Sequence, residues 1–211
     1  MISKQGWINL YKPKNITSFK AINFIKKKFV INKIGHAGTL DPMAEGVLPI
    51  AIGKATKLIS YISIINKEYN FTITWGTQTT TDDAEGKILF ESKHLPKKKE
   101  IENKIINYLG YINQIPPKVS AVKIKGRRAY KLFRENEIFA IKPKRVFVEN
   151  LTITDHSVNK TSFKITCGKG FYVRGLARDL AVDLKTYGHI SSLKRSKVGK
   201  FTEKTSILLD D

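Results

Sequence analysis

Alternating hydrophobic and polar positions predict the strands of this chain. Between residues 69 and 75, Tyr, Phe, Ile and Trp occupy every second position and Asn and Thr lie between them. A period of two is typical of a strand that buries one face. Shorter patterns predict further strands at residues 6–11, where the strand ends at Lys12-Pro13, at residues 147–153 and at residues 161–167.

Helical spacing of hydrophobic residues predicts four helices. Thr17 or Ser18 offers an N-cap for the first helix, because their hydroxyl groups accept from free backbone N–H groups. The predicted inward faces are Phe19, Ile22, Ile25 and Phe29; Ile101, Ile105 and Leu109 within residues 96–109; and Val173, Leu176, Leu180 and Leu184. Residues 54–65 also have a helical pattern.

Strands and helices are interspersed without a strict βαβ alternation. This order predicts the α+β class, with a mixed, mostly antiparallel sheet flanked by helices. Loops are predicted at residues 35–46, 76–86 and 114–134. Composition is even along the chain and shows neither an internal repeat nor a linker, which predicts a single domain over residues 1–211.

The charge balance points to a polyanionic partner. The chain has 38 Lys and Arg against 18 Asp and Glu, a formal net charge of +20. Nucleic acid fits this excess better than an anionic membrane, although a lysine-rich composition contributes to it. With 41% hydrophobic residues the chain is not a disordered basic tail. We expect a cytoplasmic protein, because neither a signal-peptide pattern nor a membrane-length hydrophobic run occurs.

Cysteine and histidine residues predict no metal site and no disulfide. Cys167 is the only cysteine, which excludes an internal disulfide framework and a multi-cysteine zinc site. The four histidines lack the spacing of metal ligands.

The segment Gly35-His36-Ala37-Gly38-Thr39-Leu40-Asp41-Pro42 continues to Leu48 and contains three glycines, which permit unusual backbone angles. Asp41 precedes a proline and is surrounded by hydrophobic residues, as a nucleophile or general base in an apolar cleft would be. An ordinary turn with the Asp side chain bonded to the backbone is the alternative.

Residues 167–180 read as a strand, a glycine turn and the start of a helix. Tyr172 and Arg174 lie near that helix start, a position suited to anions or to delivering a guanidinium to a carboxylate. A surface arginine and a core tyrosine are the alternative.

Residues 114–134 interleave basic and hydrophobic residues, as a loop along a phosphate backbone does. The predicted backbone contacts are Lys123, Lys125, Arg127 and Arg128. A solvated charged face is the alternative.

Six segments together resemble the TruB family of tRNA pseudouridine synthases, and the resemblance covers nearly the whole chain. They are Leu10-Tyr11-Lys12-Pro13-Lys14-Asn15-Ile16-Thr17-Ser18, residues 35–48, Lys67-Glu68-Tyr69 with residues 76–86, Gln114-Ile115-Pro116-Pro117-Lys118-Val119-Ser120-Ala121-Val122-Lys123, residues 167–180, and His189-Ile190-Ser191-Ser192-Leu193-Lys194-Arg195.

The resemblance implies an isomerase that flips one uridine of the tRNA T loop, at position 55, out of its stack. The enzyme breaks the C1′–N1 bond, rotates the uracil and rejoins it through C5, with neither cofactor nor metal. The implied partner is the T arm of tRNA, bound by a monomer. A pseudouridine synthase of another RNA, and an RNA-binding protein or RNA chaperone without activity, are the alternatives.

The resemblance also assigns roles to residues. Asp41 is the implied nucleophile, Tyr69 stacks on the target base, and Arg174 pairs with the aspartate and keeps it ionised. Asp83 is the outer carboxylate of that pair. Substrate binding is further implied for His36, Tyr172, Leu193 and Lys12.

The chain departs from the family pattern at several places. Asn15 replaces a glycine, Val119 replaces a tyrosine and Thr80 replaces an acidic residue. The chain ends before the C-terminal RNA-binding module (PUA-type) that many bacterial members carry, so we expect that module to be absent and the affinity for tRNA to be weaker.

Overall fold

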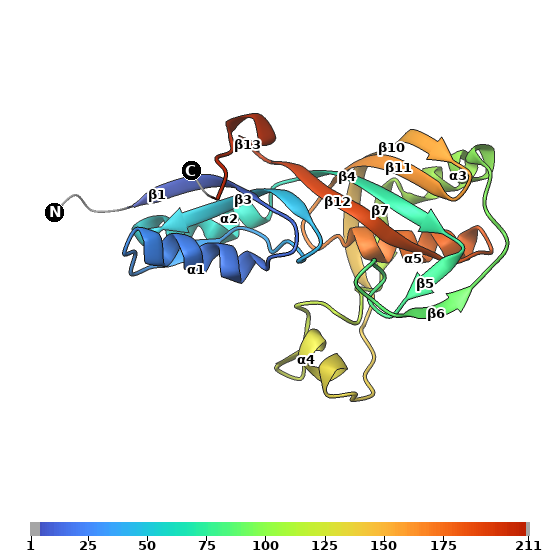
Figure 1. Cartoon of the computed structure of the whole chain (residues 1–211), viewed down its shortest axis with the longest axis horizontal. Helices are drawn as coiled ribbons and strands as arrows, with labels where there is room; N and C mark the ends of the chain where they lie inside the picture. The colour runs from blue at the N-terminus through green and yellow to red at the C-terminus, as the bar shows by residue number, and fades with distance from the viewer. Residues whose placement is uncertain (1–4, 210–211) are drawn as a thin grey trace. The chain divides into compact units, whose positions relative to one another are not determined.

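The computed structural model describes residues 5–209, which form parts of two compact units (Figure 1). The first unit comprises Met1–Asn70 and Ser192–Asp211, and the second comprises Phe71–Ser191. Residues 1–4 and 210–211 of the predicted 1–211 domain lie outside the described residues. The single domain stays a prediction.

The first unit is built around strand β3. Its strands are β1 (Gly6–Lys12), β2 (Ile34–His36), β3 (Glu45–Ile52), β13 (Phe201–Thr202) and the adjoining parts of β4 (Lys67–Trp75) and β12 (Gly188–Val198). β1 and β2 pair antiparallel with β3, and β12 pairs parallel with it through Lys194–Glu45 and Arg195–Gly46. Nearly all of β3 is buried, as expected of a strand with neighbours on both edges.

Helix α1 (Ser18–Lys28) begins where the sequence predicts. The Thr17 hydroxyl accepts from the Lys20 N–H at 3.0 Å. The buried face differs from the prediction, because Phe19 is 69% exposed and Phe29 is also exposed. Ser18 accounts for the difference: its hydroxyl donates to the Leu40 carbonyl and accepts from the Leu40 N–H, both at 2.9 Å, which turns Ser18, Ala21, Ile22 and Ile25 inward.

The remaining helices of the first unit are short. The helix predicted at 54–65 is a 3₁₀ turn, η1 (Gly53–Leu58), followed by α2 (Ile59–Ser63). A further turn, η3, covers Glu203–Thr205.

The second unit has the sheet order β12-β4-β11-β10-β7 and two hairpins. The additional strands are β5 (Thr77–Thr79), β6 (Ile88–Glu91), β7 (Gly110–Gln114), β8 (Lys123–Ile124), β9 (Arg127–Arg128), β10 (Lys144–Ser157) and β11 (Lys160–Cys167). β10 pairs antiparallel with β7 and β11. Burial alternates along β4 as predicted, and Phe71 stacks on Phe163 of β11 at 5.1 Å.

Helix α5 (Val173–Asp183) buries the predicted face at Val173, Leu176 and Leu180. Leu184, which follows its last residue, is buried too. The other helices are α3 (Lys98–Ile105), which continues as the turn η2 (Ile106–Tyr108), and α4 (Ala129–Arg134). Ile101 and Ile105 are buried as predicted, whereas Leu109 follows η2 and is exposed.

Three predicted loops contain regular structure. Residues 35–46 include parts of β2 and β3, residues 76–86 include β5, and residues 114–134 include β8, β9 and α4.

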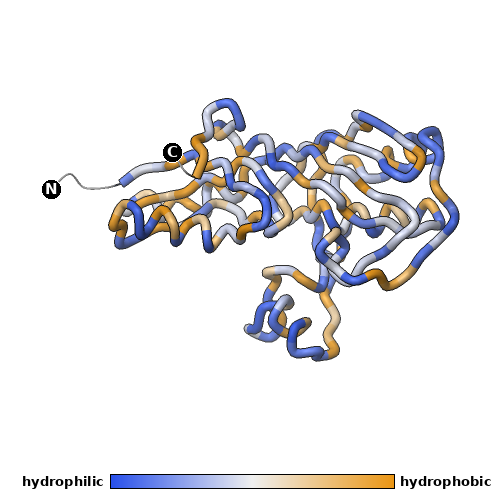
Figure 2. Tube along the Cα trace, in the orientation of Figure 1, coloured by the Kyte–Doolittle hydropathy of each residue, from blue (hydrophilic) through white to orange (hydrophobic). Residues whose placement is uncertain are grey.

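Strand β6 is hydrophobic although Ile88, Leu89 and Phe90 are exposed (Figure 2). The α+β class with a mostly antiparallel sheet is confirmed.

Candidate active site

The predicted site residues belong to both units. The first unit holds Lys12, His36, Asp41, Tyr69 and Leu193, and the second holds Asp83, Tyr172, Arg174, Lys123, Lys125, Arg127 and Arg128. Asp41 belongs to the first unit and Arg174 to the second, and their predicted pairing stays a prediction.

Asp41 lies in the loop between β2 and β3, and it is half-buried. Its own carbonyl accepts from the Ala44 N–H at 3.1 Å, and the next carbonyl, of Pro42, accepts from the Asn15 N–H at 2.8 Å. Asn15 has φ +65°, a left-handed conformation that asparagine tolerates where the family pattern has glycine. The hydrophobic residues beside Asp41 are part of the core, since Leu40, Met43, Val47 and Leu48 are buried.

Two fully buried cations hold this loop from opposite sides. The Lys12 ammonium, 0% exposed, donates to the carbonyls of Pro13, Ile16 and Pro42 at 2.8–3.3 Å. The Arg195 guanidinium, 1% exposed, donates to the carbonyls of Val47 at 2.8 Å and Gly38 at 2.9 Å. A buried charge is costly without partners, so these bonds fix the backbone on both sides of Asp41.

His36 ends β2, with its Nε2 3.0 Å from the Thr39 hydroxyl. Burial lowers the pKa of His36, and the Arg195 charge lowers it further. The imidazole is therefore neutral at pH 7, which suits stacking and hydrogen bonding rather than charge pairing.

Tyr69 and Leu193 are buried on strands β4 and β12. Two positions before Tyr69, on the same face of β4, Lys67 is also buried and donates to the carbonyls of Ser63 at 2.9 Å and Ile65 at 2.7 Å. A Cβ at Gly38 would lie 3.3 Å from Arg195 Nη1 and 3.6 Å from Lys67 Cε, so both side chains lie beside Gly38 and leave little room for a larger residue there.

Lys67 and Arg195 were given no role by the sequence analysis. A signal existed for Lys67, because it falls on the buried side of a strictly alternating strand. Nothing comparable marks Arg195.

Arg174 lies in the first turn of α5 and is 4% exposed. Its Nη1 is 3.4 Å from Asp83 Oδ2 and donates to the Thr81 carbonyl at 2.9 Å, and its Nη2 donates to the Val119 carbonyl at 3.0 Å. Asp83 in turn accepts from the Thr81 hydroxyl and from the Glu85 N–H. The guanidinium is thus held in one orientation.

Tyr172 is the N-cap residue of α5 and is half-buried. The buried Gln114 side chain accepts from the Tyr172 N–H at 2.9 Å and donates to the Tyr172 carbonyl at 3.0 Å. This paired contact joins the end of β7 to the start of α5.

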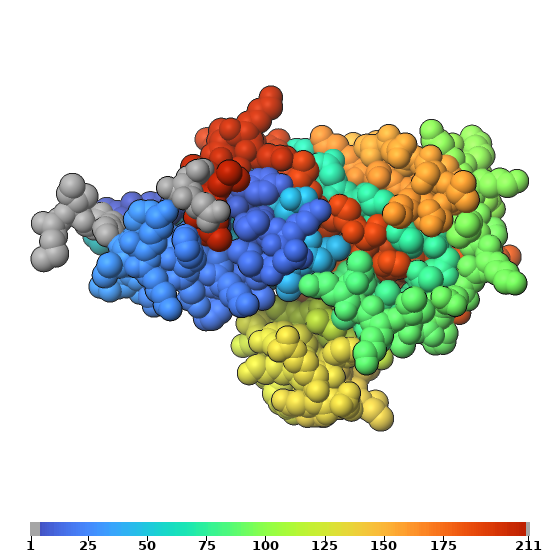
Figure 3. All heavy atoms as spheres, in the orientation of Figure 1, coloured from blue at the N-terminus to red at the C-terminus, as the bar shows by residue number. Residues whose placement is uncertain are grey.

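Residues 114–134, called the basic segment below, carry the predicted phosphate contacts (yellow-green to yellow in Figure 3). Lys123 and Lys125 are exposed. Arg127 is paired with Glu135 and Glu137, and Arg128 donates to the Ala121 carbonyl. The two lysines are therefore better placed to meet phosphate than the two arginines.

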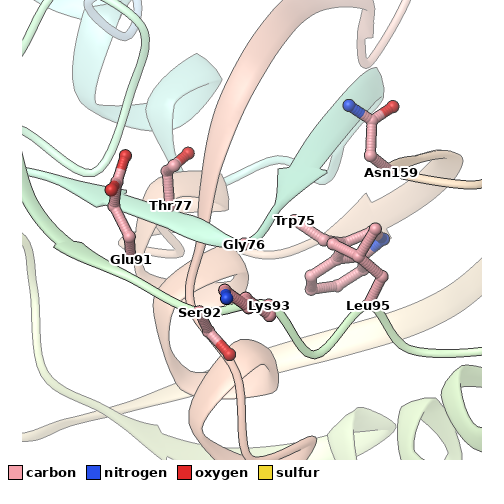
Figure 4. A pocket seen from close by; sticks show the side chains of 8 residues that line it. All are labelled: Trp75, Gly76, Thr77, Glu91, Ser92, Lys93, Leu95 and Asn159. Carbon is pink, nitrogen blue, oxygen red and sulfur yellow. The ribbon is translucent and has the colours of Figure 1, made fainter.

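The second unit contains a cavity of about 430 Å³ (Figure 4). It is lined by Trp75, Gly76, Thr77, Glu91, Ser92, Lys93, Leu95 and Asn159. None of them is a predicted site residue.

Within residues 5–209, no group of three or more His, Cys, Asp or Glu side chains could hold a metal ion. No helix in that range is long and hydrophobic enough to cross a membrane.

Comparisons with known proteins agree with the family resemblance. Residues 26–173 match the family described as TruB family pseudouridylate synthase (N terminal domain). The tRNA pseudouridine synthase B of Wolbachia pipientis subsp. Culex pipiens is 48% identical over 207 residues, which is 97% of this chain and 59% of that protein. The protein of the same name from Ehrlichia chaffeensis is 46% identical, over 97% of this chain and 70% of that protein.

Solved structures show the same fold. A chain of a Cbf5–Nop10–Gar1 complex has a TM-score of 0.77 and 28% identity, over 98% of this chain and 53% of that one. A chain of an H/ACA RNP bound to a substrate RNA has a TM-score of 0.73 and 26% identity, over 98% and 51%. On the family match and the two curated relatives, the chain belongs to the TruB family of pseudouridylate synthases.

Proposed function

We propose that this chain converts uridine to pseudouridine in tRNA, at position 55 of the T loop. The C1′–N1 bond breaks, the uracil turns, and a C1′–C5 bond forms. The hydrogen on C5 leaves as a proton and N1 gains one, so the reaction is an isomerisation without redox change. The family and the names of the curated relatives support the reaction class and tRNA as substrate.

One observation carries the proposal: the Asp41 loop is fixed by buried cations on both sides. Lys12 holds the Pro42 carbonyl, and Arg195 holds those of Gly38 and Val47. A nucleophile needs a defined position relative to the reacting atom, and such positioning supplies a large part of enzymatic rate enhancement. We infer that Asp41 adds to the target nucleotide, at C1′ of the ribose or C6 of the base.

The remaining roles concern the flipped base. Unstacking a base costs a few kcal/mol, which contacts inside the enzyme must offset. Tyr69 and Tyr172 supply aromatic surfaces, Leu193 supplies a hydrophobic one, and neutral His36 supplies a ring with hydrogen-bonding capacity. Arg174, held by Asp83, supplies a guanidinium with a fixed orientation.

The test of this function is tritium release from [5-³H]uridine in a tRNA transcript. We expect release by the wild-type chain, and a loss of at least about a thousandfold in Asp41→Asn, since the nucleophile is removed. Asp155→Asn, at an exposed position on β10, is the matched control and should retain wild-type release.

A second transcript, with the T-loop target changed to cytidine, identifies the substrate site. Loss of release there supports position 55. Release that persists and still needs Asp41 would indicate that the target is another uridine. If the wild-type chain binds tRNA but releases no tritium, the result would favour an RNA-binding protein without this activity.

The basic segment has its own test. Lys123→Gln with Lys125→Gln should lower the slope of log affinity against log salt by about 1.5 to 2, because two phosphate contacts disappear. Lys97→Gln with Lys98→Gln, two exposed lysines near Glu100 and Glu102, is the control and should leave that slope unchanged. An equal slope in both double variants would contradict the role of the segment.

A further inference from the structure

Two arginines of α5, one helical turn apart, bind the same two parts of the second unit. Arg174 bonds to the Thr81 carbonyl and to Asp83 on one side, and to the Val119 carbonyl on the other. Arg178 repeats this arrangement. Its Nη1 is 3.5 Å from Asp82 Oδ2, and its Nη2 donates to the Ile115 carbonyl at 2.7 Å.

Arg178 is itself held by its neighbour on the helix. Its Nε and Nη2 are 2.9 and 2.8 Å from Asp179 Oδ1. This contact orients the guanidinium, so that the remaining donors face the Asp82 carboxylate and the Ile115 carbonyl. Asp82 has φ +59°, a left-handed angle that aspartate adopts more readily than most residues.

These contacts converge on residues 114–120, which we call the root. The root is the first part of the basic segment, directly after β7. Gln114 is tied to Tyr172, Ile115 to Arg178, and Val119 to Arg174. Each partner lies on α5 or at its N-cap. Each of the three contacts therefore joins the root of the basic segment to the same helix, α5.

We propose that Arg178 is a positioning residue that fixes the root on α5 and thereby sets how the basic segment meets RNA. The RNA part rests on the proposed function, whereas the fixing of the root does not. Arginine suits this role, because its planar fork reaches a carboxylate and a carbonyl at fixed angles. A lysine at this position would keep the charge but lose the fork.

Hydrogen exchange on the free protein tests the fixing of the root. In Arg178→Met, three amides that donate to the root or next to it should exchange about tenfold faster, because a charge-assisted hydrogen bond is lost there. They are the amides of Tyr130, which donates to the Ser120 carbonyl, of Ala129, which donates to the Val122 carbonyl, and of Tyr172, which donates to the Gln114 side chain. Amides in β10 and β11 should keep their wild-type rates. Arg178→Lys should give an intermediate increase, since it retains the attraction to Asp82 and Asp179.

Arg145→Met is the matched control. Arg145 is on β10, and its guanidinium lies 4.3 Å from the centre of the Tyr111 ring on β7, outside the root. Its loss should leave exchange at the root unchanged. Unchanged exchange in Arg178→Met, or an increase of equal size throughout the second unit, would overturn the proposal. If Arg178→Met does not fold, Arg178→Lys decides the question. A faster exchange confined to the root supports the proposal, and unchanged exchange there overturns it.

Steady-state kinetics with tRNA test the consequence. Arg178→Met should raise KM about tenfold while kcat stays within about twofold, because the segment and not the reacting groups is displaced. A fall in kcat at unchanged KM would overturn the role in RNA positioning. If the wild-type chain shows no release of tritium, the proposed function fails, while the exchange result still decides whether Arg178 fixes the root.

Discussion

In the first unit the buried cations donate to backbone carbonyls, whereas in the second unit they also meet carboxylates. Lys12, Lys67 and Arg195 each bond to two or more carbonyl oxygens. Arg174 and Arg178 divide their donors between aspartates and carbonyls. Both arrangements give the donors buried acceptors, and in the second unit the aspartates also compensate the charge of the two arginines.

This difference has a consequence for each unit. Residues 1–40 contain neither Asp nor Glu, so the charged side chains in the part of the chain before the Asp41 loop are all positive. An excess of positive charge attracts a polyanion and stabilises a nearby carboxylate. In the second unit the ion pairs with aspartates fix the orientation of the two arginines. Their remaining donors bond to carbonyls, so that α5, residues 81–83 and the root are joined.

The largest expected effect that tests this comparison comes from Gly46→Ala. Gly46 has φ +108°, and a Cβ there would lie 2.3 Å from the Arg195 carbonyl oxygen in the parallel β3–β12 pair. Backbone strain and overpacking together should lower the free energy of unfolding by about 4 kcal/mol. Calorimetry would measure it as a fall in Tm of about 8–16 °C.

Gly126→Ala is the matched variant in the second unit. Gly126 has φ +85° in the β8–β9 turn, and a Cβ there would contact nothing within 4 Å. Only the backbone cost applies, so we expect a loss of about 1 kcal/mol. Equal losses of unfolding free energy in the two variants would show that the close approach of Gly46 to β12 adds nothing to the cost of the backbone angle.

A somewhat smaller effect is expected from Arg195→Met. The substitution leaves the buried carbonyls of Gly38 and Val47 without this donor, which should cost about 3 kcal/mol of stability. Tritium release should fall as well, because the Asp41 loop loses one of its anchors. Lys197→Met, which removes an exposed cation 3.1 Å from Glu68, is the control and should change stability by less than about 1 kcal/mol. A neutral Arg195→Met variant would refute the idea that carbonyl-bound cations stabilise this unit.

The smallest effect concerns pH and His36. Because burial and the Arg195 charge lower the pKa of His36 below its usual 6.5, the unfolded chain binds the proton more readily than the folded one. The contribution of His36 to stability is therefore complete above pH 6.5 and decreases as the pH falls below it. In His36→Gln, urea unfolding at several pH values should show a shallower acid slope, by less than about 1 kcal/mol in total.

His94→Gln, at an exposed position of the second unit, controls for the loss of a histidine as such. Identical acid slopes in the wild type and in His36→Gln would show that folding does not lower the pKa of His36.

Local patterns were enough to predict β1, β4, β10, β11, α1 and α5. In most of them buried positions recur at the period of a strand or a helix, with less buried positions between them, so the period is visible in the sequence. β3 and β12 were missed as strands. β3 has neighbours on both edges and is buried on both faces, so its sequence reads only as a hydrophobic run. The structure within the basic segment was hidden because its hairpin and helix are too short for a periodic pattern.

By itself, the sequence determined the α+β class, the family, the positive charge and the segments that carry Asp41, Tyr69 and Arg174. Those features depend on residue order and composition, which are read along the chain. Only the tertiary structure decided that Lys67 bonds to the Ser63 and Ile65 carbonyls, that Arg195 bonds to the backbone on both sides of Asp41, and that Arg178 bonds to Ile115. The reason is that their acceptors are mostly backbone carbonyls. A carbonyl is the same in every residue, and only folding decides which of them lies beside a buried cation.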